Sequence, residues 1–212
     1  MKKPMFCLLL ALSLAACKKE TKETTTATDS TATEVKTETP ASTTDAPFDI
    51  NTIPVSTKEP GTFPYLAPPE KYSYNYQKEA NPKDIKDPDK EYFAVNGKLI
   101  PREGKTYKIN IDKESSEGLK FNALEVEKYY DSKIKELGGV QVDNNARITQ
   151  EEYDRIGQTE LITKHYGSSI NVNLLDQIKT YVIRTKDKVI WVQFSLLDNE
   201  SGNITVLEEA VK

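Results

Sequence analysis

The stretch EYFAVNGKLIP, Glu91 to Pro101, is the most informative part of the sequence about the fold. Its two strand-like runs flank Asn96-Gly97, and this dipeptide is the strongest short signal for a β-hairpin because both turn residues adopt positive φ. A third run, Lys105 to Ile111, alternates apolar and polar residues, which is typical of a half-buried strand. These three runs predict an antiparallel meander.

A second hairpin is predicted near the end of the chain. The runs Tyr181 to Arg184 and Val189 to Phe194 are rich in β-branched and aromatic residues and are separated by a polar turn. Period-two alternation places the even-numbered residues of the second run on one face and Trp191 on the other. We expect a helix or loop to cover Trp191, and we expect a last strand from Ile204 to Val211.

Two helices are predicted between the hairpins. Asn122 and Thr149 are candidate N-caps, because each precedes a helical pattern and is followed three residues later by glutamate, as in a capping box. The first helix should end at Gly138-Gly139 and lead into a strand at Val140 to Val142, and the second should span Gln150 to Ile156. Because the strands come in hairpins, the sequence predicts an α+β fold with a mainly antiparallel sheet and one long and one short helix packed on it.

Residues 48 to 90 are rich in proline, tyrosine and aspartate, and the prolines exclude a long helix. A short strand is expected near Tyr72, Tyr74 and Tyr76, whose alternation would place all three rings on one face. These tyrosines and Trp191 are the candidate ligand-binding aromatics, as a stacking platform for a sugar or peptide. We favour the alternative that the strand is half-buried and that its rings simply pack.

The N-terminus has the pattern of an export signal. Lys2 and Lys3 precede an apolar run from Pro4 to Ala16, which is too short to cross a bilayer and typical of a secretory signal peptide. Leu14-Ala15-Ala16-Cys17 resembles the lipobox of bacterial lipoproteins. This resemblance implies cleavage before Cys17 and acylation, with fatty acids such as palmitate, of its thiol and of the new amino terminus. An ordinary secretory signal that happens to contain cysteine is the alternative.

The predicted processing decides the fate of both cysteines. Cys7 would leave with the signal and Cys17 would carry lipid, so no thiol would remain for a disulfide, a nucleophile or a metal. More than one acyl chain gives stable membrane anchoring. By analogy with enterobacterial lipoproteins, Lys18 after the cysteine favours the outer membrane, while the periplasmic or surface face stays undecided.

The sequence predicts three segments: a signal peptide at residues 1–16, a lipidated cysteine with a stalk at 17–47, and a single globular domain at 48–212. The stalk is dominated by threonine and has no aromatic residue, so it buries too little apolar area to fold. A flexible chain of this length reaches roughly 30 Å on average. Asp29-Ser30-Thr31 resembles a bacterial O-glycosylation motif, although a plain spacer is the preferred interpretation.

Charge and hydropathy exclude several classes of partner. The formal net charge is −4, and loss of Lys2 and Lys3 with the signal would leave −6. The chain has no basic stripe interleaved with aromatics, so a nucleic-acid partner is not expected. After Cys17 there is no apolar run of spanning length.

Four segments together suggest a family: FDINTIPVSTKEPGTFPYLAPPEKY, EYFAVNGKLIPREGKTYKI, YYDSKIKELGG and TYVIRTKDKVIWVQFSLLD. They resemble the N-terminal module of OmpA-like lipoproteins, and the likeness covers essentially Phe48 to Lys212. In that family a C-terminal domain grips peptidoglycan through an Asp and an Arg. This sequence ends before such a domain and lacks the pattern N-x-x-L-S-x-x-R-A, so we expect no peptidoglycan binding. The resemblance implies no catalytic role.

The candidates for chemistry are few. His165 is the only histidine, and it lies close to Gly167-Ser168-Ser169, which could suggest a nucleophile and its base. Sequence neighbours rarely form a catalytic triad, which is assembled in space, so we interpret His165 as a loop histidine. No Walker loop, G-x-S-x-G or H-E-x-x-H motif occurs.

Two acidic clusters could bind calcium, because calcium prefers oxygen ligands. Neither has the spacing of the known calcium-binding loop, and acids at strand ends are usually solvated, so no metal or other cofactor is expected. The clusters comprise Asp84, Asp87, Asp89 and Glu91 in the first, and Asp198, Glu200 and Asn203 in the second.

The sequence thus favours a non-enzymatic cell-envelope lipoprotein that presents a binding or structural domain on a flexible tether, with an envelope protein or glycan as partner. Two alternatives remain at this point. An envelope hydrolase acting on glycan would need two acids about 5–10 Å apart in a cleft. A solute or glycan receptor would need exposed aromatics.

Overall fold

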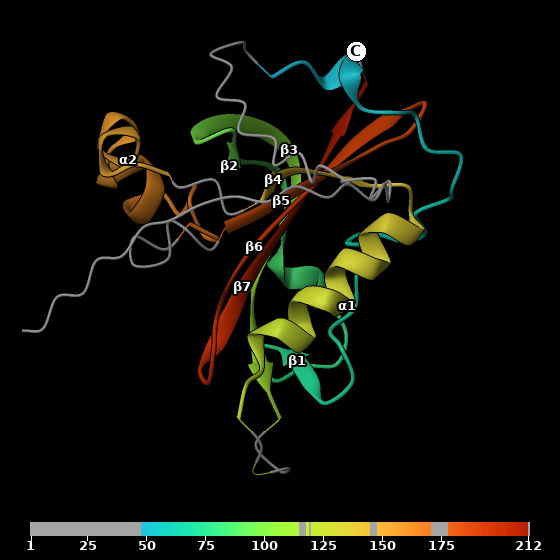
Figure 1. The fold of residues 1–212 in the computed structure, drawn as a ribbon, viewed down its shortest axis with the longest axis vertical. Coiled ribbons are helices and arrows are strands. Elements are labelled where there is room, and N and C mark those ends of the chain that lie inside the picture. Colours follow the sequence, from blue (N-terminus) through green and yellow to red (C-terminus); the bar gives the residue numbers. More distant parts are fainter. Residues whose placement is uncertain (1–47, 115–117, 119, 145–147, 171–177, 212) are drawn as a thin grey trace, which may run out of the picture. The chain divides into compact units, whose positions relative to one another are not determined.

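The computed structural model describes residues 48–114, 118, 120–144, 148–170 and 178–211 (Figure 1). The predicted signal peptide, Cys17 and the predicted stalk lie outside these described residues, so these expectations remain predictions.

The described part of the chain is built on one antiparallel sheet. Its strand order is β1-β3-β7-β6-β5-β4, and β2 pairs with β3 beside this path. Consecutive strands pair in hairpins, which confirms the predicted α+β fold. The strands are β1 (Tyr72–Tyr74), β2 (Ile85–Val95), β3 (Lys98–Lys113), β4 (Val140–Asn144), β5 (Ile178–Arg184), β6 (Lys188–Leu197) and β7 (Ser201–Ala210).

Both predicted helices form with the predicted caps. In α1 (Ala123–Glu136) the Glu125 N–H donates to Asn122 Oδ1 at 3.1 Å, and in α2 (Gln150–Ile156) the Glu152 N–H donates to Thr149 Oγ1 at 3.1 Å. Figure 1 shows α1 running alongside the long strands β6 and β7. Three further turns of helix are η1 (Ile50–Thr52), η2 (Pro82–Asp84) and the π-helix η4 (Thr159–Thr163), which the sequence analysis did not predict.

The sheet face under α1 is largely apolar, with the charged pair Lys188 and Glu208 at one end. Alternate residues of five strands point to this face, and Val126, Tyr130 and Ile134 of α1 pack on them. The cluster includes Tyr72, Tyr74, Tyr107, Ile109, Ile111, Tyr181, Ile183, Ile190, Val192, Phe194, Leu196, Ile204 and Val206.

The opposite face is apolar only at one end, where the β2–β3 hairpin folds over it. Phe93 and Val95 of β2 pack there on Val182, Trp191 and Leu207. The expectation of a helix or loop over Trp191 is therefore only partly right. The β2–β3 hairpin covers the ring with Phe93 and Arg102, and the N-terminal lead with η1 adds Phe48, Ile50 and Ile53 to the same cluster.

The predicted meander is instead one long hairpin, because β3 continues through Pro101. β3 pairs with β7 only from Lys105 onward, so one edge of the strand is unpaired at Pro101, where the missing N–H is tolerated. A Cβ at Gly104 would collide with the carbonyl oxygen of Glu208. Glycine therefore lets β3 approach β7 closely at the point where the hairpin leaves the main sheet.

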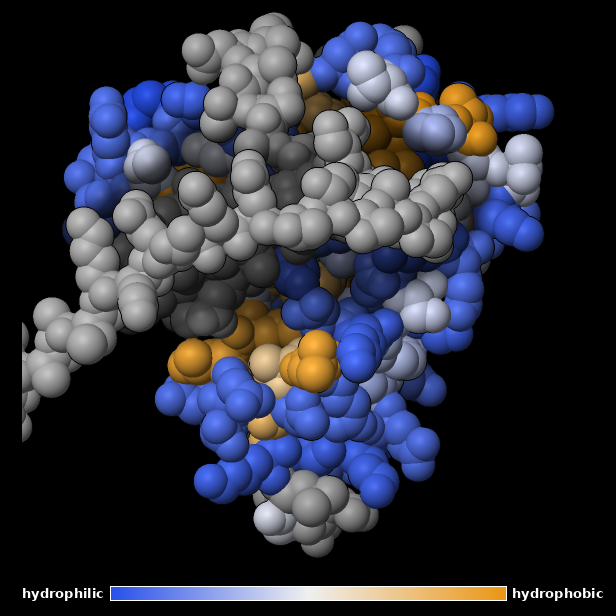
Figure 2. All heavy atoms as spheres, viewed as in Figure 1, coloured by the Kyte–Doolittle hydropathy of each residue, from blue (hydrophilic) through white to orange (hydrophobic). Residues whose placement is uncertain are grey.

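The surface around α1 is mostly hydrophilic. Figure 2 shows hydrophobic residues there only in small, separate patches. In the described part of the chain, the large exposed hydrophobic side chains other than Tyr76 belong to different segments, so these side chains form no broad apolar docking face. They are Val55, Leu124, Ile162 and Val211.

The cap of α1 gives a direct test of this local structure. Asn122→Ala removes the acceptor for the Glu125 N–H and should lower the free energy of unfolding by about 1 kcal/mol, measured by urea denaturation. Asn122→Ser retains an acceptor and should lower the free energy of unfolding by clearly less. Equal losses in the two variants would contradict a capping role.

Candidate functional site

The second half of the sheet face opposite α1 is polar, and we call it the polar half-face. Along β6 the face changes from Trp191 to Gln193 and Ser195, and along β7 it changes from Leu207 to Thr205 and Asn203. Cross-strand pairing extends this surface through β1, β3 and β5. The polar half-face consists of Ser73, Lys108, Asn110, Asp112, Thr180, Gln193, Ser195, Asn203 and Thr205.

Gln193 holds one end of the polar half-face together. Its Oε1 accepts hydrogen bonds from the Ala94 N–H at 2.6 Å and the Thr180 hydroxyl at 2.9 Å. Its Nε2 donates to the Tyr92 carbonyl at 3.0 Å and to Ser169 Oγ at 3.1 Å. All four positions of the buried carboxamide are therefore occupied, and the side chain fixes β2 and the segment after η4 against the sheet.

Lys108 joins the same three parts of the fold. Its ammonium donates to the carbonyls of Lys90 at 2.6 Å and His165 at 2.9 Å, and it lies 3.0 Å from Asp89 Oδ2 and 3.5 Å from Glu91 Oε2. An ammonium has three hydrogens, and the two carbonyls and Asp89 use them all. The charge of Lys108 is thus compensated inside the protein.

Glu91 lies beneath this ammonium and is 0 % exposed. Its two oxygens accept the N–H groups of Tyr92 at 2.9 Å and Ser168 at 3.1 Å. Burial raises the pKa of Glu91 to about 8, although Lys108 and the two N–H groups favour the charged form. Carboxyl groups with a strongly shifted pKa occur at functional sites more often than elsewhere. The surface directly above Glu91 is therefore a candidate site.

A polar pocket of about 270 Å³ opens at this place. The backbone is in the left-handed region at two of its residues, with φ of 45° at Asn75 and 59° at His165. Such conformations are uncommon for residues other than glycine and cluster at ligand sites. The lining residues are Asn75, Lys108, Ile109, Asn110, His165, Ser168 and Asn203.

The structure brings together residues from three sequence predictions. Asp89 and Glu91 of the first acidic cluster meet His165 and Ser168 at Lys108, and Asn203 of the second cluster lines the same pocket. Among the described residues, no group of three or more His, Cys, Asp or Glu side chains is placed to hold a metal ion.

The other acids serve elsewhere or face solvent. Asp198 accepts the Ala123 N–H at the start of α1, and Asp87 lines a different cavity. The Ser168 hydroxyl donates to the His165 carbonyl at 3.1 Å, so its hydrogen is not directed at the imidazole. This contact agrees with the interpretation of His165 as a loop histidine.

The expectation that Tyr72, Tyr74 and Tyr76 share one strand face was wrong. β1 ends at Tyr74, and Asn75 and Tyr76 form a two-residue turn closed by backbone hydrogen bonds between Tyr74 and Gln77. Tyr72 and Tyr74 are buried in the core, as is Trp191 on the other face, so none of these three rings is exposed for stacking. Tyr76 alone of the candidate aromatics is exposed, at 80 %.

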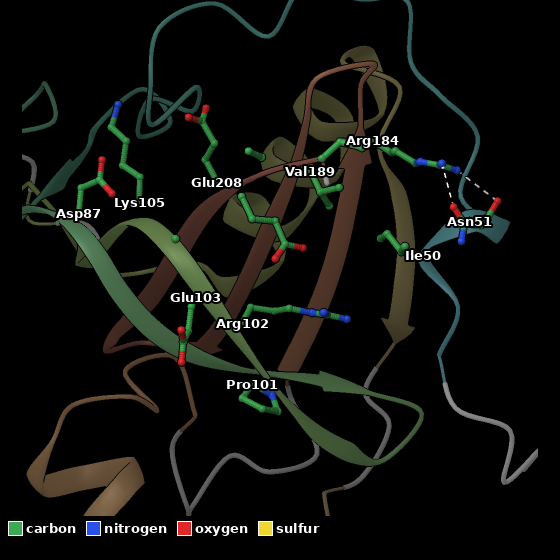
Figure 3. Close-up of a pocket in the computed structure, with 14 residues that line it drawn as sticks. Ile50, Asn51, Asp87, Pro101, Arg102, Glu103, Lys105, Arg184, Val189 and Glu208 are labelled. Atoms are coloured by element: carbon green, nitrogen blue, oxygen red, sulfur yellow. Dashed lines mark hydrogen bonds between the residues drawn. The ribbon is translucent and has the colours of Figure 1, made fainter.

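A larger cavity of about 750 Å³ lies at the other end of the sheet (Figure 3). Arg102 enters it from β3 with its guanidinium 4.6 Å from the centre of the Trp191 ring, and Arg184 turns toward Asn51, to which it donates hydrogen bonds. Four acids also line this space, so the cavity mixes both signs of charge; they are Asp87, Glu103, Glu208 and Glu209.

Lys108, Gln193, Asn75 and Asn110 were not predicted as site residues, and Asn203 was singled out only as part of an acidic cluster. A signal was present, because β3 alternates Lys108, Asn110 and Asp112 with core residues. Alternate residues of a strand lie on one face of the sheet, so these polar residues together predict a hydrophilic sheet surface.

In comparisons with known proteins, no protein-family model, curated protein or solved structure matches the chain. The resemblance to an OmpA-like module thus stays a prediction. None of the helices among the described residues is long and apolar enough to cross a membrane.

Proposed function

We propose that this chain is a lipid-anchored protein of the bacterial cell envelope whose folded domain is a non-enzymatic binding module. The lipobox-like Leu14-Ala15-Ala16-Cys17 supports the anchor. The observation that carries the binding role is the polar pocket above Glu91. The charge of Lys108 in this pocket is neutralised within the protein, whereas the asparagine side chains of the pocket make no hydrogen bond to another described residue.

The same geometry argues against the hydrolase alternative. Glycoside hydrolysis uses two carboxyl groups that reach substrate from opposite sides of the scissile bond. Here Asp89 and Glu91 share the ammonium of Lys108, and Glu91 is fully buried beneath it. A pair held in this way stabilises the segment after η4 on the sheet and does not face a substrate.

The proposed placement is an outer-membrane lipoprotein with a Thr-rich tether between anchor and domain. A tether with a mean reach of roughly 30 Å lets the domain sample the space around its anchor for an envelope protein or glycan. The mature chain is acidic and the walls of the envelope carry carboxylates, so electrostatic attraction contributes little to such encounters.

Cys17→Ser should move the protein from the membrane fraction to the soluble fraction, because acylation needs the thiol. Cell fractionation followed by detection of the protein checks this result, and the mass of the mature N-terminal peptide reports the lipid directly. Cys7→Ser is the matched control, since Cys7 would be removed with the signal. A Cys17→Ser protein that still sediments with membranes would show that the anchor lies elsewhere.

A further inference from the structure

The pocket on the polar half-face offers hydrogen-bonding groups that the protein itself does not use. Asn75, Asn110 and Asn203 line it, and their carboxamides make no hydrogen bond to another described residue. Asn110 and Asn203 are direct cross-strand neighbours on β3 and β7, so their side chains stand beside each other on the sheet. Each carboxamide provides two donors and an acceptor.

Buried polar atoms without a partner lie on the same surface. Four buried side-chain atoms have no hydrogen-bond partner in the described part of the chain, and three of them, Ser73 Oγ, Asp112 Oδ2 and Ser195 Oγ, belong to the polar half-face. Ser195 is the cross-strand neighbour of Asn203. An unsatisfied buried polar atom is costly and therefore rare. None of these three residues lines the pocket itself, so the atoms mark the polar character of the sheet face around it.

The charge of the pocket selects the kind of ligand. Lys108 is its one charged side chain, and all three ammonium hydrogens already have acceptors. An anion would therefore find no free positive charge. Hydroxyl groups are both donors and acceptors, and the three asparagine carboxamides of the pocket offer donors and acceptors to match them.

The turn that carries Asn75 also carries an exposed aromatic ring, that of Tyr76, which is not among the residues that line the pocket. Tyr76 follows Asn75, has φ of 65° and is 80 % exposed. A tyrosine with positive φ is sterically disfavoured. Strained backbone of this kind is typical of ligand sites, and here it lies next to a polar pocket. The ring offers an apolar surface with a hydroxyl at its edge.

We propose that this pocket binds a neutral, hydroxyl-rich glycan through Asn75, Asn110 and Asn203, with Tyr76 in contact with a sugar ring at the rim. The volume of about 270 Å³ lies just below the range of pockets for drug-sized ligands and suits one end of an oligosaccharide. The proposal rests on the proposed binding role and specifies the ligand class of the module.

The test uses the full chain solubilised in detergent and a panel of immobilised neutral oligosaccharides of glucose, galactose, mannose and N-acetylglucosamine. We expect saturable binding to at least one member, unaffected by raised salt concentration. Titration of that oligosaccharide should show about tenfold weaker binding for Asn110→Ala and for Asn203→Ala, because each removes hydrogen bonds to the ligand. Tyr76→Ala should weaken binding as well.

Gln158→Ala is the matched control, because Gln158 is an exposed carboxamide without a side-chain hydrogen bond at the start of η4, outside the pocket. It should bind as the unmodified protein does. Circular dichroism and melting curves establish that each variant is folded.

Several outcomes would overturn the glycan site. These are binding to no neutral oligosaccharide, unchanged binding by both asparagine variants, or a salt-sensitive preference for sulfated or phosphorylated probes. None of them affects the membrane anchoring tested with Cys17→Ser. Cleavage of a bound oligosaccharide, detected by mass spectrometry, would instead refute the non-enzymatic role while supporting the site.

Discussion

Trp191→Ala is expected to lower the free energy of unfolding by about 3–5 kcal/mol, the usual range for deletion of a buried tryptophan. Trp191 is 0 % exposed and lies between the rings of Phe48 and Phe93, at centroid distances of 5.6 Å and 5.3 Å. The Arg102 guanidinium covers the ring, and the indole N–H donates to Glu209 at 2.9 Å. The substitution would therefore empty the space between the β2–β3 hairpin and the sheet.

Urea denaturation followed by far-ultraviolet circular dichroism measures this loss. Small domains have only about 5–15 kcal/mol of stability, so Trp191→Phe is included as a milder variant that keeps a ring and should lose less. Tyr76→Ala is the control, because loss of an exposed ring usually changes stability by no more than about 0.5 kcal/mol. Similar losses for Trp191→Ala and Tyr76→Ala would contradict the assignment of Trp191 to the core.

Glu91 is expected to make the protein less stable as the pH rises from about 5 to about 8. Burial raises the pKa of Glu91 to about 8, whereas the unfolded chain has the ordinary value of 4.5. Between these values the folded chain retains a proton that the unfolded chain releases, so the free energy of unfolding falls with rising pH. Each unit of difference in pKa corresponds to about 1.4 kcal/mol, so the total fall amounts to several kcal/mol.

Glu91→Gln should remove most of this slope, because the amide does not titrate. The readout is the change of unfolding free energy with pH, since the absolute stability also reflects the altered contacts with Ser168 and Lys108. Burial also raises the pKa of Asp112 and of Glu208, and a smaller slope of the same sign should therefore remain. Glu103→Gln, at an exposed position, is the control. An unchanged slope in Glu91→Gln would refute the shifted titration.

Local signals in the sequence predicted much of the secondary structure. The turn at Asn96-Gly97 and the caps Asn122 and Thr149 depend on a few neighbouring residues, and the structure confirms all three. The continuation of β3 through Pro101 was missed, because the strand is held there by its partner β2 and not by its own propensity. Tyr76 was misplaced for a related reason, since a two-residue turn ends the alternation that the tyrosines suggest.

The candidate site was predicted only in part. Glu91, His165 and Ser168 were singled out from the sequence, but as metal or nucleophile candidates, because their common partner was unknown. Lys108 is the partner of Glu91 and His165, and the Ser168 N–H joins them by donating to Glu91. An isolated lysine on a strand carries no sequence signal for such a role. The proximity of segments more than fifty residues apart comes from tertiary structure, which composition and spacing do not encode.

Polar and apolar residues alternate along β3 and β7, so the residues of the pocket and the residues of the core lie on opposite faces of these strands. Asn110 lies between the core residues Ile109 and Ile111, and its side chain points away from the α1 core to which they belong. Variation at Asn75, Asn110 and Asn203 can therefore change what the pocket recognises while the residues that maintain the fold stay constant. A combinatorial library randomised at these three positions would use the domain as a scaffold, and selection from it should yield new specificities in proteins that melt close to the parent.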